Sequence, residues 1–379
     1  MGRIRTVGLP KIHNVPGEKR AFLPGFVELL NQYDVDIYLE YGYGKEMGIE
    51  EEAYRAVSER IHFVSKEDAY KQDFVIILKA PDVEELENMK AGSGLMSMLH
   101  YESRPGLVNK LKTKGIYGYS MDAVADDENN RMVVSYELTA LGGVRTAFQE
   151  MAKRRKDFFS KDRVPFRVTI IGMGNLGIQA GKACMELGDA SLLERLRNEE
   201  ASGVMVQYLG KDITMYHDAL KPIFSETDLL VDATRRWDFS QIIIPNERLQ
   251  YLKEEAIILD LTVDPYDTSV KPIQVKGIEG LPTGNLKKYV FEKDAEEYEQ
   301  IPKEVSTKYR RVTVSCSGWP GVLPMESMAV YEKQLWPFIK IVLTKGHNIR
   351  IESSNLHERA LYRGTLAHFE KEHQELLFV

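Results

Sequence analysis

Short apolar runs alternate along this chain with segments whose apolar residues recur at helical spacing. The early runs are Ile4–Leu9, Asp36–Leu39, Phe74–Leu78 and Gly115–Gly118, with helical segments at Phe26–Gln32, Val83–Met89 and Gly106–Thr113. The later runs are Phe166–Ile171, Val204–Leu209, Leu229–Ala233, Ile257–Leu261 and Val312–Ser315. This alternation predicts an α/β protein. Val204–Leu209, Leu229–Ala233 and Ile257–Leu261 are near-continuous apolar runs, which predicts parallel strands buried on both faces.

The length of 379 residues predicts two domains, because single cores usually stop growing near ~250–300 residues. A long apolar-periodic segment at 132–155, with a basic end, predicts a helix that bridges them. A late aromatic helix, Ser327–Thr344, is expected to return to the first domain. We therefore predict a discontinuous catalytic domain (1–135 plus 318–379) and a nucleotide-binding domain (136–317). Both are expected to be Rossmann-like doubly wound sheets, with the active-site cleft between them.

A glycine-rich loop defines the expected ligand of the second domain. The strand Phe166–Ile171 runs into G-M-G-N-L-G at 172–177 and then into a helix, which is the context that a dinucleotide-binding G-x-G-x-x-G motif requires. Gly172 permits the tight turn, Gly174 the approach of a pyrophosphate, and Gly177 the close packing of helix on strand. With Asn175 and Leu176, these glycines are the predicted cofactor-binding residues. The alternative is a glycine-rich turn that binds nothing.

The acid that would bind the cofactor ribose is displaced. Such an acid is expected roughly 20 residues past the loop, whereas Asp189 comes too early and an extra polar helix, Ala190–Ser202, intervenes. Asp212, just past the run Val204–Leu209, is the candidate. Lys211 beside it leaves room for a 2′-phosphate, so the sequence favours NAD without excluding NADP.

Three candidate residues for substrate chemistry lie in the first domain. Arg20, in a turn after the first strand, can clamp a carboxylate through a two-pronged fork; the alternative is a surface arginine that pairs with Glu18. Lys79 closes an apolar strand and suits carboxylate binding or proton transfer, unless its ammonium simply extends to solvent. His100 ends another apolar stretch and suits proton transfer, although a lone histidine is commonly structural.

Several motifs resemble one protein family. The opening V-G-L-P-K, the segment E-K-R-A-F-L-P, the strand end L-K-A-P, the stretch L-H-Y and the late W-P-G-V-L-P carry the resemblance. They are similar to alanine dehydrogenase, to the nucleotide-binding subunit of proton-translocating transhydrogenase, and to lysine-forming saccharopine dehydrogenase. The glycine loop occupies the corresponding place in that family.

The resemblance implies roles for individual residues. Arg20 and Lys79 would hold or polarise the substrate, and His100 would be the catalytic acid and base. Asp264, in L-D-L-T-V-D, would be a further catalytic residue near the nicotinamide, with a turn residue before Pro265 as the alternative. At 318–324 the chain reads G-W-P-G-V-L-P where alanine dehydrogenases carry N-M-P-G-A-V-P, so the substrate side chain stays open.

These observations predict an NAD(P)-dependent oxidoreductase that acts on CH–NH2 or CH–NH donors. Its substrate would be an amino acid, as in alanine dehydrogenase, or a secondary amine (opine), as in saccharopine dehydrogenase. The alternative is a catalytically silent NAD(H)-binding sensor. A hydride-carrying transhydrogenase component is disfavoured, because the sequence has no membrane segment.

Composition limits the partners. A formal net charge of −7 argues against nucleic-acid binding, which needs a basic face. Two cysteines, Cys184 and Cys316, show no disulfide or metal spacing, and no run of about 18 apolar residues suggests a membrane span. We therefore expect a cytoplasmic protein with a small-molecule substrate, no metal, no nucleic acid and no membrane contact. A homo-oligomer is compatible with the sequence.

Overall fold

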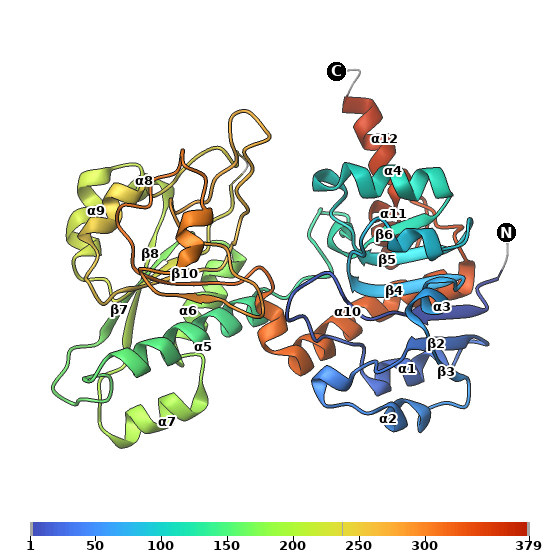
Figure 1. Cartoon of the computed structure of the whole chain (residues 1–379), viewed down its shortest axis with the longest axis horizontal. Coiled ribbons are helices and arrows are strands. Elements are labelled where there is room, and N and C mark those ends of the chain that lie inside the picture. The colour runs from blue at the N-terminus through green and yellow to red at the C-terminus, as the bar shows by residue number, and fades with distance from the viewer. Residues whose placement is uncertain (1–2, 237, 377–379) are drawn as a thin grey trace. The chain divides into compact units, whose positions relative to one another are not determined.

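The computed structural model describes residues 3–236 and 238–376 and divides into two units (Figure 1). Unit 1 is Met1–Ser135 with Pro324–Val379, and unit 2 is Tyr136–Leu323. The return into unit 1 comes at Pro324, whereas the sequence placed it at residue 318. The reason is Trp319, which is buried in the core of unit 2 and donates its indole N–H to the backbone oxygen of Asp260 at 2.8 Å.

Unit 1 is built on a six-stranded parallel sheet. In chain order its strands are β1 (Thr6–Leu9), β2 (Asp36–Glu40), β3 (Ile61–Val64), β4 (Phe74–Lys79), β5 (Gly94–Met98) and β6 (Tyr117–Ser120). The spatial order β3-β2-β1-β4-β5-β6 is that of a doubly wound sheet. β3 and β5 are absent from the sequence prediction, and β6 starts later than predicted because Gly115, in the left-handed region at φ 65°, still caps the preceding helix.

The helices of unit 1 come from both of its chain segments. They are α1 (Pro24–Leu30), α2 (Glu51–Arg55), α3 (Lys66–Tyr70), α4 (Pro105–Lys114), α10 (Pro324–Lys345), α11 (Leu356–Arg363) and α12 (Leu366–Leu376). Short 3-10 turns are Lys45–Met47, Glu85–Asn88, Tyr101–Ser103 and Met121–Ala123. The helix predicted at Val83–Met89 is therefore wrong, since only a 3-10 turn forms there. α10 completes the unit by packing Tyr331, Leu335 and Phe338 into the core with the N-terminal strands.

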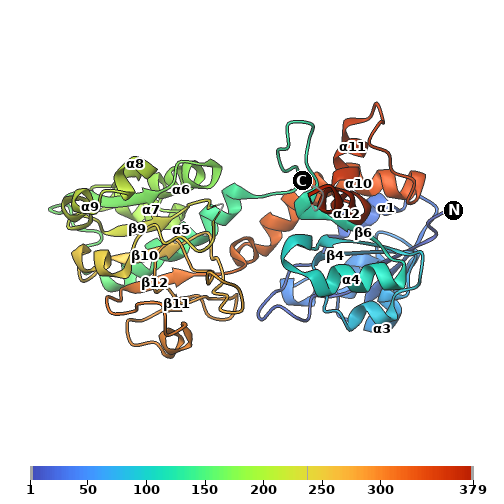
Figure 2. The ribbon, with the colours of Figure 1, turned by 90° about the horizontal axis from the view of Figure 1, so that it is seen from above.

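Unit 2 contains a second six-stranded sheet. Its strands are β7 (Phe166–Ile171), β8 (Val204–Leu209), β9 (Leu229–Asp232), β10 (Ile257–Asp260), β11 (Val290–Phe291) and β12 (Val312–Ser315). The order is β11-β12-β10-β9-β7-β8, and β9, β10, β12 and β11 follow one another in Figure 2. The short β11 is antiparallel to β12, and the other pairings are parallel. A doubly wound α/β fold is confirmed for both units.

One helix and one strand of unit 2 differ from the sequence prediction. The helices of the unit are α5 (Tyr136–Arg154), α6 (Asn175–Met185), α7 (Ala190–Asn198), α8 (Lys211–Thr214) and α9 (His217–Phe224), with 3-10 turns at Asn246–Tyr251, Glu296–Gln300 and Trp319–Val322. The helix predicted at 132–155 begins only at Tyr136 and belongs to unit 2. The prediction that β8 is buried on both faces is wrong: it is an edge strand, and most of its residues are half-buried.

A buried acid joins the two chain segments of unit 1. Glu332 on α10 accepts the backbone N–H of Leu23 at 2.5 Å, where α1 begins without a side-chain cap. Burial raises the pKa of Glu332 to about 8 from its ordinary 4.5. The folded protein therefore keeps a proton that the unfolded chain releases, so stability falls as the pH rises from about 4.5 to about 8.

Glu332→Gln is expected to remove this pH dependence. The amide oxygen still accepts from Leu23 but cannot ionise, so the variant should gain about 3–4 kcal/mol over the parent between pH 5 and 8. Melting temperatures across that range measure the effect. The control is Glu326→Gln on the exposed side of the same helix, and parallel curves for Glu332→Gln and the parent would contradict the prediction.

Candidate functional site

Three candidate residues lie at one edge of the unit 1 sheet. Lys79 ends β4, His100 follows β5, and Arg20 lies in the loop between β1 and α1. β1, β4 and β5 are neighbours in a parallel sheet, so their carboxyl ends meet at one edge, where open α/β sheets bind ligands. The loop after β1 is tied to the turn after β4, since Asn14 Nδ2 donates to the backbone oxygen of Ala80 at 2.9 Å. The structure thus brings the three residues to the same edge.

Arg20 is buried and paired with Glu18. Its side chain is 2% exposed, and its Nε and Nη2 atoms donate to the two carboxylate oxygens of Glu18 at 2.8 and 2.5 Å. Burial raises the pKa of Glu18, but hydrogen bonds and charge from Arg20, aided by the charge of Lys79, outweigh burial and lower it. The alternative was a surface arginine that pairs with Glu18. The pairing is present, but Arg20 is buried and does not lie at the surface. Arg20 also lines a small cavity of about 70 Å³.

His100 forms a dyad with Asp122. Its Nδ1 lies 3.1 Å from Asp122 Oδ2, and 44% of its side chain is exposed. Asp122 Oδ1 also accepts the backbone N–H of His100 at 3.3 Å and the hydroxyl of Ser120 at 2.7 Å. Burial would raise the pKa of Asp122, but the hydrogen bonds and charge of His100, with the Ser120 hydroxyl, lower it to about 2. An ionised Asp122 favours the tautomer with its proton on Nδ1, which leaves Nε2 able to accept a proton.

The backbone of His100 is unusual. Its φ of 47° and ψ of 56° lie in the left-handed region, which is uncommon for a residue other than glycine and costs of order 1–3 kcal/mol. The hydrogen bond from the His100 backbone N–H to Asp122 Oδ1 helps to hold this conformation. The sequence reasoning missed Asp122. The available signal was an acid just past β6, the strand that neighbours β5.

The glycine loop of unit 2 has the geometry that a dinucleotide requires. It joins β7 to α6, whose first two residues are Asn175 and Leu176. Gly172 has φ 98°, and a Cβ on Gly177 would lie 2.2 Å from the Gly172 backbone oxygen, so helix and strand touch. A Cβ on Gly174 would meet nothing within 4 Å. The loop therefore presents open backbone at the N-terminus of an eleven-residue helix, which fits a pyrophosphate.

Asp212 does not follow the second strand of this unit directly. β8 ends at Leu209, Gly210 comes next, and Asp212 is an exposed residue in the first turn of α8. The strand-end position itself is therefore glycine. The structure places Asp212 beyond that position.

Asp264 is held in an ion pair at the edge of the unit 2 sheet. Its Oδ2 accepts from Arg236 Nη2 at 2.7 Å. Arg236 is buried and also donates to the backbone oxygens of Gln241 and Val275. The arginine thus joins the segment after β9 to the segment after β10, which carries Asp264.

Two buried aspartates escaped the sequence reasoning. Asp232 and Asp260 end β9 and β10 and are register partners. Asp260 Oδ2 accepts from Lys276 Nζ at 2.8 Å, and the Lys276 side chain is only 2% exposed. Burial, then the charge of Asp260, raises the pKa of Asp232. The signal available in the sequence was an aspartate closing each of two apolar strands.

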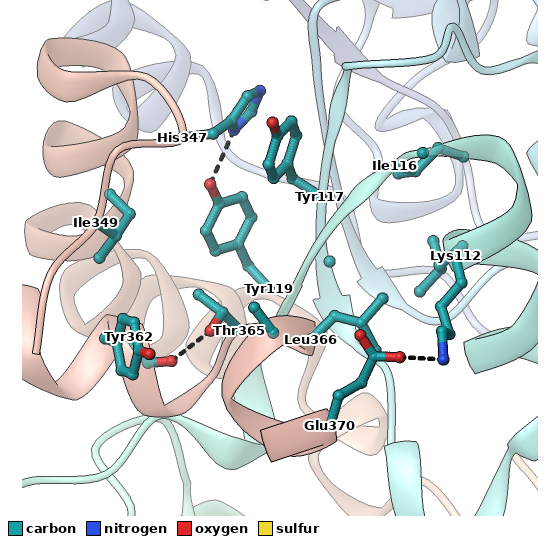
Figure 3. Close-up of a pocket in the computed structure, with 14 residues that line it drawn as sticks. Lys112, Ile116, Tyr117, Tyr119, His347, Ile349, Tyr362, Thr365, Leu366 and Glu370 are labelled. Atoms are coloured by element: carbon teal, nitrogen blue, oxygen red, sulfur yellow. Dashed lines mark hydrogen bonds and ion pairs between the residues drawn. The ribbon is translucent and has the colours of Figure 1, made fainter. Parts of the chain in front are cut away.

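A larger cavity lies elsewhere in unit 1. It measures about 440 Å³ and is bounded by β6, α4, α12 and the segment after α10 (Figure 3). His347 stacks on Tyr117, with ring centroids 4.1 Å apart, and its Nδ1 lies 2.8 Å from the Tyr119 hydroxyl. Its walls include none of the candidate catalytic or cofactor residues.

The first part of the chain is similar to a known domain family. Residues 9–138 match the family model described as alanine dehydrogenase/PNT, N-terminal domain. The resemblance inferred from the motifs is thus confirmed for alanine dehydrogenase and transhydrogenase, whereas the saccharopine dehydrogenase branch stays a prediction. The matched residues include Arg20, Lys79, His100 and Asp122.

Two curated relatives extend the similarity beyond the matched domain. Alanine dehydrogenase of Bacillus subtilis (strain 168) is 25% identical over 272 residues, covering 68% of this chain and 70% of that protein. NAD(P) transhydrogenase subunit alpha of Haemophilus influenzae is 22% identical over 366 residues, covering 91% of this chain and 68% of that protein.

Solved structures share the fold. An L-alanine dehydrogenase aligns with a TM-score of 0.71 at 19% identity, covering 95% of this chain and 94% of the other. A transhydrogenase from Sinorhizobium meliloti aligns at 0.63 and 16% identity, covering 89% and 95%. Within the described part of the chain, no helix is both long and apolar enough to cross a membrane.

Proposed function

We propose that this protein is an NAD(P)-dependent dehydrogenase that oxidises the amine-bearing carbon of an amino acid. The observation that carries the proposal is the His100–Asp122 dyad, which lies at the same sheet edge as Arg20 and Lys79 within the alanine dehydrogenase/PNT domain. A carboxylate clamp beside an acid–base pair is what the oxidation of an amino acid requires.

Each side chain then has a defined task. Arg20, which Glu18 orients through Nε and Nη2, and Lys79 bind the substrate carboxylate and so orient the carbon–hydrogen bond that breaks. His100 Nε2 takes a proton from the amine as the hydride leaves, which gives an iminium. The imidazole, whose side chain is 44% exposed, passes this proton to solvent. It then takes a proton from the water that adds to the iminium and returns it to the nitrogen as the carbon–nitrogen bond breaks, which releases a 2-oxo acid and the amine. Asp122 stabilises the imidazole each time it carries a proton.

The second unit supplies the redox partner of this reaction. The nicotinamide, when bound, accepts the hydride. Gly172, Gly174 and Gly177, with Asn175 and Leu176, would hold the pyrophosphate at the start of α6. Asp264 is proposed as the further catalytic residue near the nicotinamide, and the segment after β8 that contains Asp212 would receive the adenosine ribose.

A second candidate is a nucleotide-binding protein without amino-acid turnover. The similarity to transhydrogenase subunit alpha across 91% of this chain favours a hydride carrier that works with a partner subunit, and a silent NAD(H) sensor belongs to the same class. Neither role needs an ionised aspartate that orients an exposed histidine beside a carboxylate clamp.

The deciding experiment tests a panel of substrates and measures NAD(P)H formation by its absorbance. The purified chain is mixed with primary amino acids and with opines, each with NAD⁺ and with NADP⁺. Turnover of a primary amino acid establishes the alanine-like reaction, and turnover confined to secondary amines establishes the opine-like one. Nucleotide binding without turnover of any donor would favour the second candidate.

Asp122→Asn is expected to lower kcat by about tenfold or more, because the neutral amide no longer selects the His100 tautomer or stabilises its protonated form. KM and nucleotide affinity should stay near the parent values, since the clamp and the glycine loop are unchanged. The shape of the pH–rate profile should also change, which a mere loss of stability would not cause.

The control for this variant is Asp36→Asn. Asp36 on β2 faces His62 of β3 at 3.9 Å, so it is a second aspartate–histidine pair on the same sheet. Equal effects of the two substitutions on kcat would remove the proposed role of Asp122.

A further inference from the structure

We propose that the nucleotide site of unit 2 prefers the 2′-phosphorylated dinucleotide NADP(H), with Lys211 binding the 2′-phosphate. The inference rests on the dinucleotide site of the proposed function and reverses the preference for NAD that the sequence suggested.

The end of β8 lies directly beside the glycine loop. Ile171 and Leu209 are register partners, and the Gly172 backbone N–H donates to the Leu209 backbone oxygen at 3.2 Å. The next residue, Gly210, therefore occupies the strand end where a site for NAD carries an acid that accepts from the ribose hydroxyls. Glycine supplies no such acceptor.

Gly210 also leaves space for a phosphate. A Cβ at this position would meet nothing within 4 Å. A carboxylate there would repel a 2′-phosphate, whereas the bare backbone of glycine does not. The position thus lacks the carboxylate that would both bind the ribose hydroxyls of NAD and repel the 2′-phosphate of NADP.

Cations flank the glycine loop on both sides. Lys211 follows Gly210 and is exposed. On the other side, Arg235 is exposed just after the segment whose Ala233 backbone oxygen would lie 2.6 Å from a Cβ on Gly172. An ammonium interacts with phosphate as a point charge and gains much less from two neutral hydroxyls.

Asp212 is the competing candidate. It is exposed, but it lies one residue further along the chain than Lys211, within the first turn of α8 and past the strand end. If Asp212 accepted the ribose hydroxyls, its carboxylate would favour NADH. The two assignments therefore predict opposite nucleotide preferences.

The inference is tested by titrating the full-length chain with NADPH and with NADH. Nicotinamide fluorescence or calorimetry measures binding, and no amine substrate is present. The parent should bind NADPH at least about tenfold more tightly, as a charge-assisted contact implies. Lys211→Gln should lose most of that difference by weakening NADPH alone. Asp212→Asn should leave NADH affinity unchanged and keep NADPH at least as tight.

Lys182→Gln is the matched control, because it makes the same charge change at an exposed lysine in the last turn of α6. It should alter neither affinity. Tighter binding of NADH, weakened by Asp212→Asn and insensitive to Lys211→Gln, would overturn the inference and leave the proposed function standing. Failure of both nucleotides to bind the folded chain would overturn the proposed function and the inference with it.

Discussion

His100→Ala is expected to lower turnover by about 10²–10⁴-fold, because the variant loses the group that moves protons during both amine oxidation and water addition. Nucleotide affinity should stay at the parent value, since the glycine loop lies in the other unit. The melting temperature should fall modestly, because the variant leaves the largely buried Asp122 carboxylate without its imidazole partner. Steady-state kinetics with the amine substrate found in the panel measure turnover. Titration with NAD(P)H measures nucleotide affinity.

The sheet provides a matched control for this variant. His62 on β3 has 47% of its side chain exposed, against 44% for His100, and each faces an aspartate. His62→Ala should therefore leave kcat and KM unchanged. Full activity in His100→Ala would show that another group moves the protons, and the dyad would then be structural.

Gly177→Ala is expected to abolish detectable nucleotide binding and to lower the melting temperature. The new Cβ would lie 2.2 Å from the Gly172 backbone oxygen, and no rotation of a side chain can relieve a clash with backbone. α6 must shift away from β7, which costs about 1–3 kcal/mol or more and moves the amide groups that face the pyrophosphate. Differential scanning fluorimetry and NAD(P)H titration report the two effects.

Substitutions at two other glycines distinguish the loss of nucleotide binding from the loss of stability. Gly174→Ala should keep the parent melting temperature, because its Cβ would meet nothing within 4 Å. It should still weaken nucleotide binding by about tenfold or more, because the methyl group takes the space that the pyrophosphate needs. Gly106→Ala on α4 also enters open space and should change neither quantity. Unimpaired nucleotide binding in Gly177→Ala would contradict the assignment of the loop.

Local sequence pattern was enough for the α/β class and for the nucleotide loop. The run Phe166–Ile171 is apolar enough to predict a buried strand, and G-x-G-x-x-G after such a strand has one common geometry. The same reasoning placed Arg20, Lys79 and His100 at strand ends or in the loop between a strand and a helix. Strand ends of a parallel sheet meet at one edge, so their proximity followed from the fold class.

The hydrophobic pattern did not predict the structure correctly where a strand was short or lay at the edge of a sheet. The four residues of β3, Ile61–Val64, alternate in burial because the strand ends the sheet, and four residues carry little periodic signal. β8 has the apolar composition of a central strand, yet it forms the other sheet's edge. An edge position depends on which strands pair, and pairing is a property of the whole sheet.

The sequence by itself determined the fold class, the glycine loop and the residue types available at the strand ends. The tertiary structure alone decided their environments: it buried the Arg20–Glu18 pair, set Asp122 against His100, and brought Glu332 to Leu23 from 309 residues away. The physical reason is that secondary structure and turn chemistry arise from neighbours in sequence. Burial, charge pairing and pKa arise from neighbours in space, which only the packed chain supplies.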